Sequence, residues 1–548
     1  MLKLATVLDN PGEPFAQTQY RDPAHLKAMG YTGLVIYETT GLSGIEGAET
    51  LGSGEIGRWV AQQYDQVAQR INQARFAGLE VYILFDALSL ARVIVSKNAD
   101  QYTCRNRPTA LCPASEQTVL KSVETLGRLL EQLPTVDGVV LRFGDNDAAR
   151  LPYLIGNDIY SPHCPRCSQL GRADRIVQLI EHFHRLVVTK LDKRLIVRAW
   201  NVKPNGMHDS VDLCRRVCER LPGDAQDPRL VLSFKFTQTD FWRYQKWNPS
   251  SLACGGRPVI YELQCQREFE GKGGIPNWQV PLWTDGPAEI DEANRGGLKQ
   301  VASQINFAGL WAWARGGGWG GPFVTKETWI DVNVFAVPHL VDEPGLDTSE
   351  LTDRWIERQF GSVTPALSKA IKETLAKSPQ LILQGFYLGP YAKSRMDPWH
   401  PNGDWIQDDQ VDAQAAWRII QRLPEAELDA IVLEKQQAVE CLAGLQEAMS
   451  QAAEPSSKQT IEPLVNSLIY AESLFMTLRD LLAGLVAYRR YQKQRSPELA
   501  DQCRRRLTAA QSHWTQHSQR HGSLSGTATS FREVHFWELT QNILNQLS

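Results

Sequence analysis

The sequence lacks any long hydrophobic run and any strong excess of charge of one sign. None of its apolar stretches approaches the ~20 residues that a membrane-spanning helix needs, so no membrane partner is expected. Its 58 Lys and Arg residues nearly balance 62 Asp and Glu residues, which leaves a net charge of −4 and argues against a nucleic-acid partner. No basic segment followed by an apolar one opens the chain. This predicts a cytoplasmic protein as the sequence stands, or a secreted or periplasmic one if a signal peptide preceded Met1.

Cysteine is also scarce, because ten cysteines in 548 residues are too few for a disulfide-stabilised scaffold. Apolar residues at 43% and charged residues at 22% are ordinary for a globular protein, which excludes disorder as the main state. Tryptophan, by contrast, is plentiful at sixteen residues, many of them after predicted strands. Flat aromatic rings suit a sugar-binding cleft, and core packing is the other explanation for them.

The first part of the chain alternates short β-branched apolar runs with amphipathic helical segments. This alternation is typical of a parallel sheet built from βαβ units. Eight such runs in roughly 340 residues fit a TIM barrel, so we expect an α/β fold with a (β/α)8 catalytic barrel over residues 1–343. The connection between the sixth and seventh runs is rich in Trp, Pro and Gly and is expected to lack a helix. The predicted strands are Leu4–Leu8, Leu34–Tyr37, Val81–Phe85, Val139–Phe143, Leu195–Trp200, Val231–Phe236, Val259–Leu263 and Leu310–Ala314.

From about Leu346 onward, helical periods replace the strands. A stripe of apolar side chains at spacings of three and four runs from Leu464 to Leu485, as in a helix of a packed bundle. We therefore expect an all-α C-terminal domain over residues 344–548. An aromatic segment rich in Gly and Pro, residues 384–405, interrupts the helices. It either folds over the barrel mouth or packs the two domains together.

Three consecutive predicted strands each place one cation near the same rim of the barrel. In a TIM barrel this rim, at the C-terminal ends of the strands, holds the active site. The cations are Arg142, Arg198 and Lys235, and the last two lie inside apolar runs. A buried cation needs a partner, which is either a carboxylate on a ligand or one of the barrel's own acids.

Carboxylates gather at the same rim. Asp145 and Asp147 follow the fourth strand, Asp240 follows the sixth and Glu262 ends the seventh. Glycoside hydrolysis uses two carboxyl groups, one as the acid and one as the base or nucleophile. Neighbouring cations would keep the base ionised, while a drier carboxyl group would stay protonated. The rim therefore predicts a hydrolase of acidic sugars. Further residues expected to contact the substrate are Gln264, Trp200, Trp311, Trp313 and Trp319.

Two stretches around these acids carry a family resemblance. The first is Ser233-Phe-Lys-Phe-Thr-Gln-Thr-Asp240-Phe, in which a Lys lies five residues before an Asp-Phe pair. The second is Tyr261-Glu-Leu-Gln-Cys-Gln-Arg-Glu-Phe-Glu-Gly271, which leads to Pro281-Leu-Trp283. Both resemble glycoside hydrolase family 67, the α-glucuronidases. The positions that match without gaps are Lys235, Asp240, Glu262, Gln264 and Glu268. Arg198-Ala-Trp200 and Gly317-Gly-Trp319-Gly-Gly resemble the family's fifth and eighth strands.

The resemblance implies an inverting mechanism in which Asp240 and Glu262 activate water. It also implies that Arg142, Arg198 and Lys235 bind the carboxylate of the uronic acid. Two departures stand out: the family's β-rich N-terminal domain has no counterpart before the first strand, and its general acid, a Glu after the fourth strand, falls on Asn146. Asp145 and Asp147 flank that position, so a shift of one residue would restore a carboxyl group.

Four further cysteines raise the question of a metal. Cys164 and Cys167 have the two-residue gap of half a zinc site, and Cys104 and Cys112 would have to supply the other half. The eight-residue spacing of that second pair is not usual for a zinc finger, so a local disulfide or free thiols are preferred to structural zinc. Cys214 and Cys218, at helical i, i+4 spacing, are expected to be buried packing residues. We assign no catalytic metal and no cofactor.

The leading hypothesis is an exo-acting, inverting glycoside hydrolase that releases α-linked glucuronic acid, or a related uronic acid, from an oligosaccharide. Asp240 or Glu262 would activate the water, and Asp145 or Asp147 would protonate the leaving oxygen. One alternative is a β-N-acetylhexosaminidase-like barrel, since Asp145-Asn-Asp147 followed by His163-Cys-Pro-Arg-Cys167 resembles a motif of such domains. A second alternative is a catalytically silent carbohydrate-binding protein. A homodimer through the helical domain is the expected protein partnership.

Overall fold

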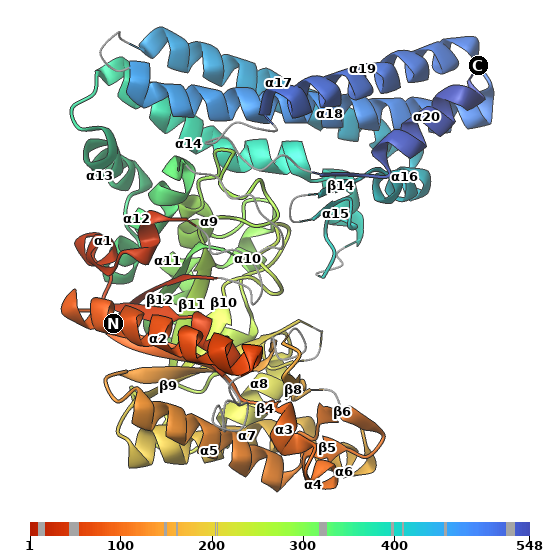
Figure 1. The fold of residues 1–548 in the computed structure, drawn as a ribbon. Helices are drawn as coiled ribbons and strands as arrows, with labels where there is room; N and C mark the ends of the chain where they lie inside the picture. The colour runs from red at the N-terminus through yellow and green to blue at the C-terminus, as the bar shows by residue number, and fades with distance from the viewer. Residues whose placement is uncertain are drawn as a thin grey trace.

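The structure is a computed structural model that describes residues 1–8, 17–42, 54–146, 151–160, 163–202, 204, 206–316, 326–395, 399–407, 410–453, 458–521 and 532–547. Within this part of the chain, parallel strands close into a barrel in the order β1-β12-β11-β10-β9-β7-β3-β2 (Figure 1). All eight lie where the apolar runs predict them, which confirms the TIM barrel. They are β1 (Leu2–Val7), β2 (Gly33–Ile36), β3 (Glu80–Asp86), β7 (Gly138–Gly144), β9 (Arg194–Asn201), β10 (Leu230–Lys235), β11 (Pro258–Gln264) and β12 (Asn306–Arg315).

Helices cover the outside of the barrel because each buries one apolar stripe against the strands. In α2 (Glu55–Phe76), for example, Val60, Val67 and Ile71 are buried on one face. Residues 236–257, between β10 and β11, contain only a 3-10 turn, η5 (Ser250–Ala253), as the composition of that connection predicts. The other helices of the barrel are α1 (Pro23–Ala28), α5 (Glu116–Gln132), α7 (Arg172–His184), α8 (Val211–Cys218), α9 (Val280–Asp285), α10 (Glu292–Arg295), α11 (Leu298–Val301) and α12 (Thr328–Asp342).

Two inserts follow the C-terminal ends of β3 and β7 and meet each other (Figure 1). β4 of the first insert pairs antiparallel with β8 of the second, and the first insert also forms the hairpin β5–β6. The mouth of the barrel on this side is therefore built from two interlocked segments. Their elements are β4 (Ser89–Ala91), α3 (Arg92–Val95), α4 (Ala99–Tyr102), β5 (Thr103–Cys104), β6 (Arg107–Leu111), β8 (Leu154–Gly156) and α6 (Pro165–Gln169).

Long helices form the C-terminal region, as expected, and α18 lies alongside both α17 and α19 (Figure 1). The predicted apolar stripe from Leu464 to Leu485 is buried in α18. No described helix is both long enough and apolar enough to cross a membrane. The helices are α13 (Thr348–Phe360), α14 (Pro365–Phe386), α15 (Gly389–Arg395), α16 (Ala413–Arg422), α17 (Glu425–Ala452), α18 (Lys458–Gln494), α19 (Pro497–His521) and α20 (Phe536–Gln546).

The C-terminal region also contains a small sheet, which corrects the all-α expectation. Its strands are β13 (Ile406–Gln407), β14 (Gln410–Asp412) and β15 (Arg532–Val534), and β14 pairs with both neighbours. Strands of two or three residues are too short to show an alternating pattern, so the sequence carries no signal for them. The aromatic segment 384–405 is also partly helical, because it includes the end of α14 and all of α15.

A buried carboxylate joins the barrel to the helical region. Glu270 is fully buried between the guanidinium groups of Arg243 and Arg267, and the Tyr387 hydroxyl donates a hydrogen bond of 2.9 Å to it. Burial alone would raise the pKa of Glu270, but the two arginines lower it well below its usual range. Tyr387 directly follows α14, so this cluster fixes the helical region against the loops after β10 and β11.

Candidate active site at the barrel mouth

Arg198 is the centre of the polar cluster at the mouth. Its side chain on β9 is completely buried, and its Nε donates to both carboxylate oxygens of Glu262 at 3.1 Å. Its Nη1 contacts Asp145 at 3.3 Å. Burial would lower the pKa of Arg198, but Glu262 and Asp145 raise it above its ordinary value, so the guanidinium stays charged. In the described part of the chain, Nη2 of Arg198 has no hydrogen-bond partner.

Lys235 forms the second ion pair, with Asp240, five residues further along the chain. Its ammonium group is enclosed by aromatic rings, 3.9 Å from the ring centre of Trp200 and 4.4 Å from that of Phe241. Such cation–π contacts strengthen when the cation is withdrawn from water. Asp240 itself keeps 29% of its side chain exposed, so one carboxylate of the pair faces the mouth while the lysine is buried.

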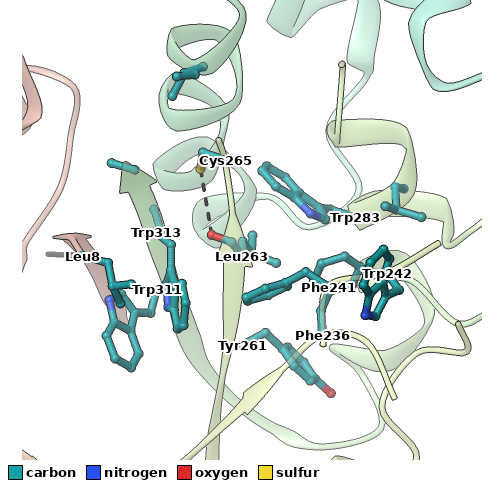
Figure 2. Packing of buried hydrophobic residues seen from close by; sticks show 14 of the residues in the cluster. Leu8, Phe236, Phe241, Trp242, Tyr261, Leu263, Cys265, Trp283, Trp311 and Trp313 are labelled. Carbon is teal, nitrogen blue, oxygen red and sulfur yellow. Dashed lines mark hydrogen bonds between the residues drawn. The ribbon is translucent and has the colours of Figure 1, made fainter. Parts of the chain in front are cut away.

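Trp313 contacts both cations, Arg198 and Lys235. The Arg198 guanidinium lies 5.0 Å from its ring centre and Lys235 Nζ lies 5.1 Å from it. Figure 2 shows Trp313 and Trp311 on the same strand, among the buried side chains of this end of the barrel. Trp311 is completely buried and Trp313 is 4% exposed, so both rings pack in the core rather than offering an open stacking face. Of the two explanations for the tryptophans, sugar binding and core packing, the structure therefore shows core packing for Trp311 and Trp313.

The aromatic segment after α15 reaches the mouth. The Trp399 ring stacks on Trp200, with ring centres 5.7 Å apart and planes at 24°. Trp200 is the same ring that contacts Lys235. Of the two alternatives left open for residues 384–405, contact with the barrel mouth is observed at Trp399, and packing between the barrel and the helical region is observed at Tyr387.

Arg142, in register with Arg198 on the neighbouring strand, is engaged by residues of the barrel itself. Its Nε and Nη2 bind the two oxygens of Asp86 at 2.5 and 2.9 Å, and Nη1 contacts the Tyr37 hydroxyl. Both side chains of the ion pair are 1% exposed. The sequence alone allowed two kinds of partner for Arg142, a carboxylate on a ligand or an acid of the barrel. The structure shows that the partner is an acid of the barrel, Asp86.

The remaining predicted residues are placed as follows. The side-chain oxygen of Gln264 accepts a hydrogen bond of 3.0 Å from the backbone N–H of Glu268, so it shapes the loop after β11. Asn146, on the position of the expected general acid, donates its amide to the carbonyl of Asn157. Asp147 and Trp319 lie outside the described residues.

Sequence reasoning missed two polar residues of the cluster. The Ser233 hydroxyl donates to Glu262 at 2.9 Å, and its place two residues before Lys235, on the same face of β10, is a signal that would have found it. His208 is completely buried, with its ring edge against Trp200 and Nε2 at 3.1 Å from the Thr237 carbonyl. It lies in a loop after β9, where no periodic pattern marks it.

His208 makes stability depend on pH. Burial, followed by the charge of Lys235, lowers the pKa of His208 to about 3 from 6.5, so the unfolded chain binds a proton that the folded chain does not bind between these values. Its neutral form therefore supports the fold above pH 6.5, and stability falls as pH drops towards 3. Between pH 7 and pH 5, His208 should account for a loss of about 2 kcal/mol in the free energy of unfolding.

The variant His208→Gln should show a correspondingly smaller loss than wild type over that interval. Urea unfolding at pH 7 and pH 5 measures it. His400→Gln is the matched control, since His400 is exposed, and it should lose as much stability as wild type. Equal losses in His208→Gln and wild type would contradict this role for His208.

Comparison with known proteins supports the architecture. No protein-family model and no curated protein sequence matches the chain. A glycoside hydrolase family 138 enzyme that targets pectin rhamnogalacturonan II is similar in structure, with a TM-score of 0.58 and 13% identity, over 100% of this chain and 83% of that one. Two weaker likenesses are a mutant of the Thermobaculum terrenum O-GlcNAc hydrolase (TM-score 0.43, 9% identity, 100% and 94% covered) and CpGH84B (0.41, 9%, 100% and 77%).

At these identities the first neighbour shows the fold alone, a barrel with a helical region, and the other two are too distant in structure to carry an argument. None of the comparisons shows the family 67 assignment. The mouth of this barrel holds three ion pairs: Arg198 pairs with Glu262 and with Asp145, and Lys235 pairs with Asp240. Both cations lie beside the ring of Trp313.

Proposed function

We propose that the protein is a glycoside hydrolase that releases a uronic acid from an acidic oligosaccharide. The observation that carries the proposal is Nη2 of Arg198, a buried charged donor at the catalytic end of a TIM barrel without a hydrogen-bond partner in the described chain. Leaving such a donor unpaired is costly, and a carboxylate is its best acceptor. The carboxylate of a uronic acid bound at the mouth supplies that acceptor.

Exposure separates the roles of the three carboxylates. The side chains of Asp145 and Asp240 are each 29% exposed, whereas that of Glu262 is completely buried and held by Arg198 and Ser233. We therefore assign Asp240 and Asp145 to the reaction and make Glu262 a positioning residue that orients Arg198. This differs from the pair implied by the family resemblance, in which Glu262 activates water together with Asp240.

The reaction that follows is a hydrolysis with inversion. Asp145 enters the reaction as the protonated carboxylic acid. Water attacks the anomeric carbon and passes a proton to Asp240, while the bond to the leaving oxygen breaks and Asp145 donates its proton to that oxygen. The Asp145 carboxylate that remains pairs with Arg198. Inversion leaves room for the water between carboxyl groups that lie ~6.5–9.5 Å apart. Asp147 remains the second candidate for the acid. An exo-acting mode is part of the proposal, because the Trp399 ring stacks on Trp200, whose ring contacts Lys235 at the mouth.

The binding step is tested by calorimetric titration of methyl glucuronide against methyl glucoside. Wild type should prefer the uronide by about tenfold or more, because a hydrogen bond between charged groups contributes about 1.5–3 kcal/mol. Arg198→Gln should lose this preference. Arg220→Gln is the matched control, since Arg220 forms an exposed pair with Asp174 and should leave the preference unchanged. Equal affinity of wild type for both sugars would contradict the proposal.

A further inference from the structure

Four cysteines from the two inserts at the barrel mouth meet in one buried cluster. Cys104 ends β5 and Cys112 follows β6, while Cys164 precedes α6 and Cys167 lies in it. Their Sγ atoms all lie within 4.8 Å of one another. The two pairs that span the inserts are 3.9 Å apart for Cys104 and Cys167, and 3.8 Å apart for Cys112 and Cys164.

These separations are those of thiolates around one tetrahedral metal ion. Zinc–sulfur bonds of ~2.3 Å in a tetrahedron place sulfur atoms about 3.8 Å apart, whereas a disulfide needs about 2.05 Å. The unusual spacing in the sequence is also explained. The β5–β6 hairpin pairs Thr103 with Leu111, so the chain folds back and brings the sulfur atoms of Cys104 and Cys112 together although the two residues are eight positions apart in the sequence.

Hydrogen-bond donors point at two of the four sulfur atoms. The backbone N–H groups of His163 and Cys164 point at the Cys167 sulfur, at 2.9 and 3.1 Å, and Arg166 Nε lies 3.3 Å from the sulfur of Cys112. Such donors stabilise thiolates and orient metal ligands. The four cysteines form a cluster separate from the main hydrophobic core, with Ala114 packed against them, so no large apolar contact accounts for the gathering.

We propose that Cys104, Cys112, Cys164 and Cys167 bind one structural Zn²⁺ ion. Four protein thiolates close the coordination sphere, which is typical of structural rather than catalytic zinc. Binding releases the thiol protons and leaves a complex of net charge −2, next to the Arg166 guanidinium. The proposal is independent of the proposed hydrolase activity.

The ion would cross-link the two inserts, after β3 and after β7, that form one side of the mouth. Leu111, next to Cys112, accepts a hydrogen bond of 2.6 Å from the Asn157 side chain, and the Asn157 carbonyl accepts from Asn146, the neighbour of Asp145. Zinc at the cysteine cluster therefore holds the insert after β3 against the segment that carries Asp145. Its removal should loosen both inserts while the barrel strands remain folded.

A second group of cysteines provides a control within the same chain. Cys214, Cys218 and Cys254 also have Sγ atoms within 4.8 Å of one another. This group contains three thiols rather than four and belongs to the main hydrophobic core, where α8 packs on η5. Its geometry is explained by packing, so it is expected to bind no zinc.

The test measures metal content by plasma mass spectrometry after expression with added zinc and extensive dialysis. Wild type should hold one zinc per chain, Cys167→Ser and Cys104→Ser should lose it, and Cys218→Ser should keep it. A second measurement uses the wild-type protein and so does not depend on whether the variants fold. A reagent that binds thiolates, such as a mercurial, should release the zinc. Replacement by Co²⁺ should give the intense visible bands of tetrahedral thiolate coordination. Tryptic cleavage after the exposed Arg105 should speed up once a chelator removes the ion.

Three results would overturn the proposal. The first is wild-type protein without stoichiometric zinc. The second is zinc that is lost in Cys218→Ser and kept in Cys167→Ser. The third is iron in place of zinc, which tetrahedral sulfur ligands also accept. A mass of the wild-type protein that shows two disulfides among these four cysteines would also overturn the proposal, because no thiolate would then remain to bind zinc.

Discussion

Replacing Asp240 by Asn should lower kcat on an acidic oligosaccharide by roughly 10²- to 10⁴-fold, with KM little changed. The amide has the shape of the carboxylate but cannot accept a proton from water. Lys235 stays enclosed by Trp200 and Phe241, so the pocket should keep its form. Steady-state kinetics on wild type and variant measure the effect.

The control for this prediction is Asp174→Asn, an exposed acid paired with Arg220 on the barrel surface. It should leave kcat and KM unchanged. Glu262→Gln adds a second comparison. As a positioning residue it should mainly raise KM, through Arg198, rather than abolish turnover. A kcat of Asp240→Asn equal to that of wild type would remove Asp240 from the mechanism.

Replacing Arg142 by Met should lower the free energy of unfolding by about 3–5 kcal/mol. Methionine fills much of the arginine's volume but leaves Asp86, 1% exposed, as a buried carboxylate that has lost its cation. Transferring such a charge from water is expensive when its partner is gone. Urea unfolding at pH 7 measures the loss.

Two comparisons show whether burial is the cause. The double variant Arg142→Met/Asp86→Leu should recover most of the lost stability, because it removes both charges together. At an exposed pair, Arg128→Met beside Glu124 should cost no more than about 1 kcal/mol. A loss of that small size in Arg142→Met would show that the Asp86 pair contributes little to stability.

The barrel could be predicted from the sequence because its strands are buried on both faces. Val139–Leu141 and Leu195–Val197, for example, are completely buried runs, so each strand shows as an uninterrupted apolar segment. Helix α18 could be predicted because its buried face carries apolar side chains at helical spacing. The short strands β13–β15 were not, because pairing between residues 410–412 and 532–534 depends on contacts that are distant in the sequence.

The residues of the candidate site could be predicted from the sequence, but which carboxylate pairs with which cation could not. Strand ends indicate that Arg142, Arg198 and Lys235 share a rim, yet only the register of neighbouring strands decides which carboxylate each cation meets. Asp86 aligns with Arg142 across β3 and β7, whereas Lys235 aligns with Glu262 across β10 and β11 but binds Asp240 from the following loop. Burial, which separates Glu262 from Asp240, also follows from tertiary packing rather than from local sequence.

The zinc proposal illustrates the same limit. The spacing of Cys104 and Cys112 argues against a metal when it is measured along the chain. It favours one once the β5–β6 hairpin is formed and α6 lies against it. A contact between two inserts separated by the whole of α5 and β7 leaves no trace in a local pattern.

The most direct test of the central claim follows the sugar released from a panel of capped oligosaccharides by proton NMR. The panel contains α-linked uronic acid caps and β-linked N-acetylhexosamine caps, and Asp240→Asn is run in parallel. Wild type should release the uronic acid first as the β-anomer, which reports inversion, and the variant should release it far more slowly. Release of an N-acetylhexosamine with retained configuration would contradict the proposed uronic acid hydrolase. Binding of uronate without release of any cap would also contradict it, and would indicate a carbohydrate-binding protein instead.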